Sequence, residues 1–374
     1  MRRRAWRDPN SLRCGWPQSG TTESRPSAVN WWCVIVGLSI CLVANAVASA
    51  AVPRLAAPAS GGPRTQVRGM IVSCPRHGRI WGSDAMVRTM EMLRGEGVNW
   101  IAIHPYASIR EDGAVRASYV ADPERDVSWL TRPIAEAHRL GLKIMIKPHL
   151  AYWGSRFSWR GEIEFQTDRQ WDRFFTSYER WINRLATICE GADAFTVGTE
   201  LERTVHHEAR WRAIISSVRS RTEAQLTYAA NWDRYERVRF WDALDVIGIQ
   251  AYFPLIDHDR GPEPEELNVS WGRIVQKLAE YGRRHDRRIL FSELGYHRSS
   301  DTARRPWASG RTGSGDAELV QRRCLHAALG AVDGAEHIIG AFLWKWFPGE
   351  RAHGSHQMSA PAMRQVIADR WGTR

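Results

Sequence analysis

Residues 195–203 read FTVGTELER, a short run of apolar and small residues that ends at Glu200. About ninety residues later, residues 288–296 read RILFSELGY and place Glu293 in the corresponding position. A buried strand that leads straight into one carboxylate therefore occurs twice in this chain. Side chains at the carboxyl ends of parallel strands gather at one edge of a sheet or at one mouth of a barrel. The two stretches thus point to a fold that brings both glutamates together.

Short apolar runs recur along the whole body of the chain and alternate with longer amphipathic stretches. Strands that alternate with helices are typical of parallel βα units. Eight such units favour a single (β/α)8 barrel in the α/β class, a so-called TIM barrel. If one run is misread and only seven are strands, the fold class stays the same. The expected strands are 67–73, 98–106, 143–150, 193–201, 225–232, 245–252, 288–296 and 338–346.

The stretches between these runs show helical spacing, and three of the connections are long and polar. No G-x-G-x-x-G motif follows the first run, which argues against a doubly wound dinucleotide-binding sheet. The long loops at 105–124, 253–265 and 297–316 all follow the carboxyl end of an expected strand, where a barrel builds its binding site. The expected helices are 83–95, 126–141, 168–190, 207–220, 233–241, 266–284, 316–333 and 358–371.

Glu200 closes the fourth run and Glu293 closes the seventh. Two carboxyl groups over one barrel mouth suit a retaining glycosidase, in which one carboxyl serves as acid/base and the other as nucleophile, roughly 5–5.5 Å apart. Such a reaction requires no metal or organic cofactor, and we expect none. Glu202 is an alternative to Glu200, because strand alternation points both the same way. Glu200 is preferred because Glu202 lies further out.

The strings RGMIVSC, VNWIAIHPY, KIMIKPH, TVGTELE, FSELGY and FLWKW, taken in this order and spacing, resemble glycoside hydrolase family 113. The resemblance covers about residues 66–370. This family belongs to clan A, and its characterised members are β-mannanases. The resemblance implies that Glu200 is the acid/base, that Glu293 is the nucleophile and that the substrate is a β-1,4-mannan-type polysaccharide. Most clan A families carry Asn before the acid/base. In this chain Thr199 occupies the position before the acid/base, and family 113 is similar in lacking that Asn. Another polar residue must then contact the sugar 2-hydroxyl, and Asn231 is the candidate.

Further residues at the strand ends are candidates for substrate binding. Tyr252 is expected to hydrogen-bond the nucleophile, as a clan A tyrosine at this strand often does. Trp344 and Trp346 are two residues apart on one strand and should point to the same face, so we expect one of them to form the floor of the sugar site. Trp232 is a similar candidate. The other candidates for contacts with sugar hydroxyls are Lys147, His149, His104 and Tyr106.

Two other functions remain compatible with the sequence. One is another clan A β-glycosidase, such as a glucanase or an exo-acting enzyme. The other is a non-catalytic, membrane-tethered barrel that binds carbohydrate, against which the presence of both glutamates speaks. The net charge of +11 does not indicate a nucleic-acid partner, because the basic residues are spread along the chain among 41 acidic ones. We expect a monomer.

The first fifty residues have the features of a targeting segment. A basic leader precedes an apolar stretch at 31–51, and Ala48-Ser49-Ala50 forms an A-x-A cleavage site. The stretch is also near the length that spans a bilayer. We therefore expect a signal peptide or signal anchor at 1–50, a linker at 51–65 and the catalytic domain at 66–374, in an exported, secreted or periplasmic protein. Cys74, Cys189 and Cys324 of the body show no metal-binding spacing.

Overall fold

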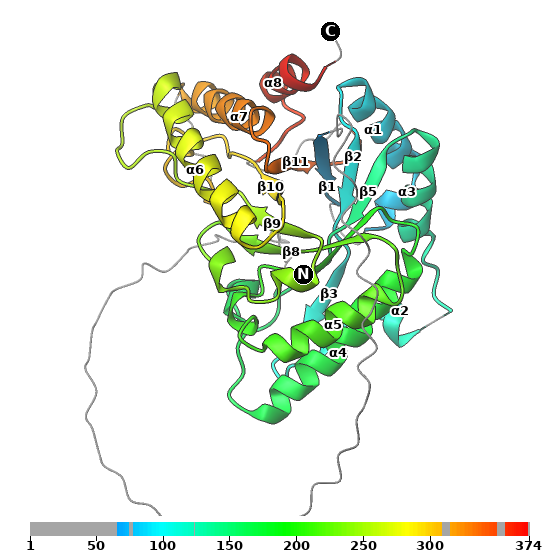
Figure 1. Ribbon diagram of the computed structural model, residues 1–374. Coiled ribbons are helices and arrows are strands. Elements are labelled where there is room, and N and C mark those ends of the chain that lie inside the picture. Colours follow the sequence, from blue (N-terminus) through cyan, green and yellow to red (C-terminus); the bar gives the residue numbers. More distant parts are fainter. Residues whose placement is uncertain (1–65, 75–77, 123, 309–314, 350–355, 373–374) are drawn as a thin grey trace, which may run out of the picture. The chain divides into compact units, whose positions relative to one another are not determined.

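The computed structural model describes residues 66–74, 78–122, 124–308, 315–349 and 356–372. Eight parallel strands form a closed barrel in the order β1-β11-β10-β9-β8-β7-β5-β2 (Figure 1). All eight predicted strands are present, so the (β/α)8 prediction is confirmed. The barrel strands are β1 (Val67–Val72), β2 (Trp100–Ile103), β5 (Lys143–Ile146), β7 (Ala194–Thr199), β8 (Gln225–Asn231), β9 (Val246–Gln250), β10 (Ile289–Leu294) and β11 (Ile338–Trp346).

Helices surround the barrel and follow all but one of its strands. The long helices among the described residues are α1 (Asp84–Gly95), α3 (Ser128–Arg139), α4 (Asp168–Ile188), α5 (Glu208–Arg219), α6 (Pro264–Arg284), α7 (Ala317–Asp333) and α8 (Pro361–Trp371). The predicted helix at 233–241 is wrong. Two 3-10 turns, η5 (Tyr235–Arg237) and η6 (Trp241–Ala243), stand there instead. The buried residues of this short connection, Tyr235, Val238, Phe240 and Trp241, are aromatic or β-branched and favour helix only weakly.

The second and third predicted strands are each interrupted at a proline. β2 ends before Pro105, and the chain resumes as β3 (Tyr106–Ile109); β5 ends before Pro148, and the chain resumes as β6 (His149–Ala151). Proline lacks the N–H that would continue the barrel ladder. β3 pairs with β6 in parallel and with β4 (Val115–Arg116) in antiparallel fashion. The region 105–124, predicted as a polar loop, therefore contains β3, β4 and the short helix α2 (Ser118–Ala121), part of a small side sheet next to the barrel mouth.

Two apolar cores hold the barrel in shape. One fills its interior and includes Ile71, Met145, Leu290 and Phe342, and the larger one lies between the strands and the helices. Packing inside the barrel is close: a Cβ on Gly69 would lie 2.4 Å from the Phe342 ring. A small apolar cavity at the amino-terminal end of the barrel belongs to this interior core, since its lining includes the first residues of several strands. The glutamates lie at the opposite end.

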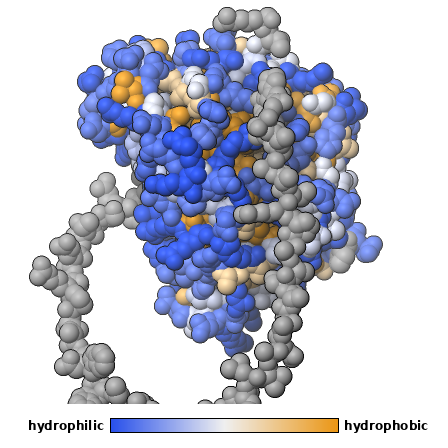
Figure 2. All heavy atoms as spheres, in the orientation of Figure 1, coloured by the Kyte–Doolittle hydropathy of each residue, from blue (hydrophilic) through white to orange (hydrophobic). Residues whose placement is uncertain are grey.

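Large apolar side chains are rarely exposed on the described part of the chain. Those that are exposed are Met92, Trp153, Val269 and Leu319. On the face that Figure 2 shows, hydrophilic residues cover most of the surface and apolar residues form separate small groups. Within the described ranges no helix has the length and apolar character needed to cross a membrane. The predicted targeting segment at 1–50 and linker at 51–65 lie outside the described residues. Cys74, Cys189 and Cys324 form no disulfide bond within the described part of the chain.

Candidate active site

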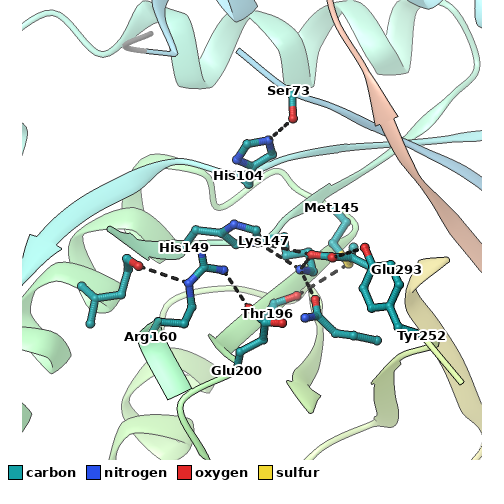
Figure 3. Close-up of polar contacts among 12 residues, drawn as sticks. Ser73, His104, Met145, Lys147, His149, Arg160, Thr196, Glu200, Tyr252 and Glu293 are labelled. Atoms are coloured by element: carbon teal, nitrogen blue, oxygen red, sulfur yellow. Dashed lines mark hydrogen bonds and ion pairs between the residues drawn. The ribbon is translucent and has the colours of Figure 1, made fainter. Parts of the chain in front are cut away.

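Glu200 and Glu293 lie at the same end of the barrel. Glu293 is the fifth residue of β10, and Glu200 directly follows the last residue of β7. Strands β8 and β9 separate the two in the barrel wall, so the glutamates face one another across part of the mouth. Figure 3 shows both side chains together with Lys147, Tyr252 and Arg160, which bond them. The charge of each acts on the other, because the Glu293 carboxylate is one of the groups that raise the pKa of Glu200.

Glu293 is buried and receives a hydrogen bond at each carboxylate oxygen. Lys147 Nζ lies 2.5 Å from Oε1, and the Tyr252 hydroxyl donates to Oε2 over 2.8 Å. His149 Nε2 lies 3.7 Å from Oε1. The hydrogen bond expected for Tyr252 is therefore present. An ammonium group and a phenol thus hold both oxygens of this carboxylate through hydrogen bonds.

Lys147 is completely buried and uses its ammonium group within the protein. Besides Glu293, its Nζ donates to Gln250 Oε1 over 2.8 Å and lies 3.0 Å from His149 Nε2. Burial lowers the pKa of Lys147, and the charge of Glu293 opposes this shift. Burial, together with the charge of Lys147, also lowers the pKa of His149 well below its usual value, so this ring is neutral and its Nε2 accepts. Lys147 and His149 thus lie against the glutamate, and their predicted contacts with sugar hydroxyls stay a prediction.

Glu200 has a different environment, contributed by the loop after β6. Arg160 Nη1 and Trp159 Nε1 both lie 3.2 Å from the same oxygen, Oε2. Burial raises the pKa of Glu200; Arg160 opposes this shift and the charge of Glu293 adds to it. The Glu200 backbone is left-handed, with φ of 55°, and its N–H still donates to the Ala229 carbonyl. The result is a raised pKa for Glu200, which favours the protonated form of its carboxyl.

No local sequence pattern points to Trp159 and Arg160 as site residues. Arg160 begins the 3-10 turn η3 (Arg160–Glu162), far from Glu200 in sequence. Only its position in the segment after the third predicted strand, on the side of the barrel where sites form, could have drawn attention to it. Arg160 is itself buried and also hydrogen-bonds the Leu150 carbonyl, which fixes the guanidinium beside Glu200.

Glu202 lies next to Glu200 but does not follow strand alternation. Strand β7 ends at Thr199, and Glu202 begins the 3-10 turn η4 (Glu202–Thr204). Its Oε1 accepts a hydrogen bond of 2.8 Å from Asn231 Nδ2, and burial raises its pKa to about 7. Asn231, the candidate for a contact with the sugar, is thus bonded to Glu202. The two residues and Glu200 line one small cavity.

An aromatic wall adjoins the side of Glu293. His104 bonds Ser73 Oγ over 2.7 Å and stacks on His149, with ring centroids 4.9 Å apart. Trp344, which is half-buried, packs against both rings at 5.4 and 5.8 Å. Tyr106 meets His104 edge-on at 5.3 Å. Tyr106 and Trp344 are half-buried, so a ligand can reach these two members of the wall, whereas His104 is buried.

Trp346 and Trp232 are not part of this aromatic wall. Trp346 is buried in the outer core, where the Arg364 guanidinium lies 5.9 Å from its ring. The predicted shared face of Trp344 and Trp346 is wrong, because the pairing of β1 with β11 shifts register between these residues, next to a cis peptide bond after Trp344. Trp232 directly follows the last residue of β8 and stacks on Trp307, with centroids 5.4 Å apart, and its predicted sugar contact stays a prediction.

Comparison with known proteins gives a consistent result. The sequence model of glycoside hydrolase family 113 matches residues 74–359. Among solved structures, a family 113 β-mannanase from Alicyclobacillus acidocaldarius, in complex with ManMIm, is 27% identical, with a TM-score of 0.69 over 82% of this chain and 97% of that one.

Other solved structures share the fold alone. A family 113 β-1,4-mannanase is 19% identical, with a TM-score of 0.68 over 83% of this chain and 99% of that one. A β-glucuronidase from Ruminococcus gnavus is 15% identical, with a TM-score of 0.53 over 82% of this chain and 50% of that one. No curated protein matches the sequence.

Proposed function

Because the chain belongs to glycoside hydrolase family 113 and is a glycoside hydrolase, we propose that it hydrolyses β-1,4-mannan-type polysaccharide internally and with retention of configuration. Glu293 acts as nucleophile and Glu200 as acid/base. The observation that carries the proposal is that the two carboxyl groups have different surroundings. Glu293 is bonded by an ammonium group and a phenol, whereas burial and the neighbouring negative charge raise the pKa of Glu200.

In the first step Glu293 attacks the anomeric carbon while Glu200 gives its proton to the departing glycosidic oxygen. A carboxylate offers about four lone-pair positions, so Glu293 retains lone pairs for this attack beside the bonds from Lys147 and Tyr252. These two donors hold the nucleophile in place before the sugar arrives. Holding a reacting group in the right geometry lowers the entropic part of the barrier.

The second step requires Glu200 to change from acid to base. Once Glu293 forms the glycosyl ester, its negative charge is lost, and with it one of the causes that raise the pKa of Glu200. Arg160 and Trp159 then bond the ionised Glu200 carboxylate. Glu200 in this form takes a proton from the water that attacks the ester, and the resting state returns. The loss and return of the Glu293 charge thus lowers and then restores the pKa of Glu200 between the two steps.

The substrate class rests on the family and on the β-mannanase at 27% identity. The test is to incubate the protein with mannans and glucans and to size the products over time, with Glu293→Ala as the control. We expect β-mannan to be cleaved first into oligosaccharides of mixed length, which is the pattern of internal cleavage. Release of single sugars from the outset would contradict the endo assignment, and cleavage of glucans alone would contradict the mannan assignment.

We also propose that the protein is exported as a monomer, through cleavage of the leader between Ala50 and Ala51. Support comes from the basic residues, the apolar stretch and the A-x-A site in the sequence. Sequencing the amino terminus of exported protein should give Ala51 as the first residue. Recovery of the intact leader in the membrane fraction would instead favour an anchored form.

A further inference from the structure

Trp153 is an unusually exposed aromatic side chain near the active site. It is 50% exposed, which makes it the most exposed large apolar side chain among the described residues and the only aromatic one of that group. Tryptophan in soluble proteins is highly buried on average. An exposed aromatic ring with a polar atom at one edge is typical of a ligand contact.

The backbone presents this ring in a defined position. Residues 152–155 form a turn in which the Ser155 N–H donates to the Tyr152 carbonyl over 3.0 Å. Ser155 Oγ bonds the same carbonyl over 2.6 Å. Gly154 has a positive φ of 81°, the value that the third residue of a type II turn requires. Trp153 is the second residue of this turn, so its side chain projects from a hydrogen-bonded tip.

A continuous series of ring contacts joins Trp153 to the active site. Its ring lies 5.3 Å from Tyr106 and 6.0 Å from Tyr152, measured between centroids. Tyr106 in turn lies 5.8 Å from His149, the ring that contacts both Lys147 and Trp344. The pairing of Tyr106 with His149 between β3 and β6 fixes this arrangement, so the side sheet extends the barrel mouth toward Trp153.

The catalytic charges reach this series of rings. Burial raises the pKa of the Tyr106 hydroxyl, and the charges of Arg160 and Glu293 also act on it. Behind the tyrosines, the Arg160 guanidinium lies 6.0 Å from the Tyr152 ring, and Arg160 bonds Glu200. Trp153 is therefore the exposed outer end of a series of packed side chains that reaches both glutamates.

We propose that Trp153, backed by Tyr106 and Tyr152, is a sugar-binding subsite that stacks on a pyranose ring of the polysaccharide beyond the rings that flank the cleaved bond. The proposal rests on the proposed function and extends it. One exposed ring is far smaller than the roughly 800 Å² per partner of a stable protein interface, but it matches the flat apolar face of a single sugar. A hydrolase that cleaves within a polymer needs such contacts away from the reacting bond.

The test measures both binding and hydrolysis as a function of chain length. Binding of β-1,4-linked manno-oligosaccharides of increasing length is titrated against Glu293→Ala, with and without Trp153→Ala. We expect the affinity for the longest chains to fall by about tenfold, as for loss of a typical stacking anchor, while the shortest chains bind equally well. On the active protein, Trp153→Ala raises KM for the polymer and leaves hydrolysis of an aryl glycoside with one sugar unchanged.

Two further variants make the result specific. Trp153→Phe keeps an aromatic ring and should retain most of the affinity for long chains. Leu319→Ala removes a side chain of similar exposure from α7 and should change nothing. Equal binding of all lengths by Trp153→Ala overturns the subsite even if the wild type cleaves mannan. If the wild type neither binds nor cleaves mannan but binds another β-linked polysaccharide in a Trp153-dependent way, the subsite stands and the proposed substrate falls.

Discussion

The ends of strands β7 and β10 carry the same local pattern and have opposite surroundings. Each is an apolar strand that leads to a glutamate, yet Glu293 meets Lys147 and Tyr252, and Glu200 meets Trp159 and Arg160. Lys147 and Tyr252 come from the ends of two other strands, whereas Trp159 and Arg160 come from one loop. The difference teaches that a strand-end glutamate supplies a carboxyl, and that its neighbours from elsewhere in the chain decide whether it holds a proton or attacks carbon.

The largest expected effect comes from removing Glu293. In Glu293→Ala the glycosyl ester cannot form, so both steps stop and kcat falls by about 10⁴-fold or more, as for other nucleophiles. Added azide should restore turnover with inverted configuration, because it attacks from the position that the carboxylate left. Glycosyl azides analysed by NMR report the configuration. A product of retained configuration would assign the nucleophile to another residue.

Removal of Glu200 should give a loss that depends on the leaving group. General acid catalysis contributes roughly 10²–10⁴-fold, so Glu200→Ala should lose about that much on mannan. An aryl mannoside with an acidic phenol needs little protonation and should still glycosylate Glu293. Azide should then give a product of retained configuration. Glu202→Ala is the matched control, and if that variant is inactive while Glu200→Ala is normal, Glu202 is the acid/base.

The ion pair between Lys147 and Glu293 allows the surroundings of the nucleophile to be tested separately from those of Glu200. In Lys147→Met, Glu293 loses the donor that holds its Oε1 in place, and we expect kcat to fall by about 10²-fold, the typical cost of a misplaced reacting group. Stability should also fall, because an uncompensated buried charge remains. Lys143→Met, on the exposed first residue of the same strand, is the control. Unchanged kcat in a folded Lys147→Met protein, checked by circular dichroism, would remove Lys147 from the mechanism.

The smallest effect concerns the pH profile and tests the surroundings of Glu200. Arg160 lowers the pKa of Glu200, so replacing this cation by neutral Gln should let Glu200 keep its proton to higher pH. The alkaline limb of kcat/KM for Arg160→Gln should therefore move to higher pH, with less than about tenfold loss at the optimum. Arg156→Gln, on the same loop but exposed, should leave the limb in place. A shift to lower pH would mean that another group sets this limb.

Part of the fold and of the candidate site could be predicted from the sequence alone. The eight strands follow from apolar runs of fixed length, and the strand-end positions of Glu200, Glu293 and Tyr252 follow from the strands. The partners of the glutamates could not be predicted in the same way. Lys147 reaches Glu293 across 146 residues of sequence, and no local pattern records that contact. Strand alternation also failed where β7 ended before Glu202 and where β11 shifted register beside Trp346.

Covalent labelling tests most directly the claim that the two strand ends have different roles. A fluorinated mannoside with a good leaving group forms a glycosyl-enzyme that breaks down slowly, because fluorine destabilises the charged transition states of both steps. Digestion and mass spectrometry then identify the labelled carboxyl. We predict one sugar per chain, bound to Glu293, with Glu200 unmodified. A label on Glu200, or a hydrolytically active enzyme that releases inverted product and never accumulates label, would contradict the assignment.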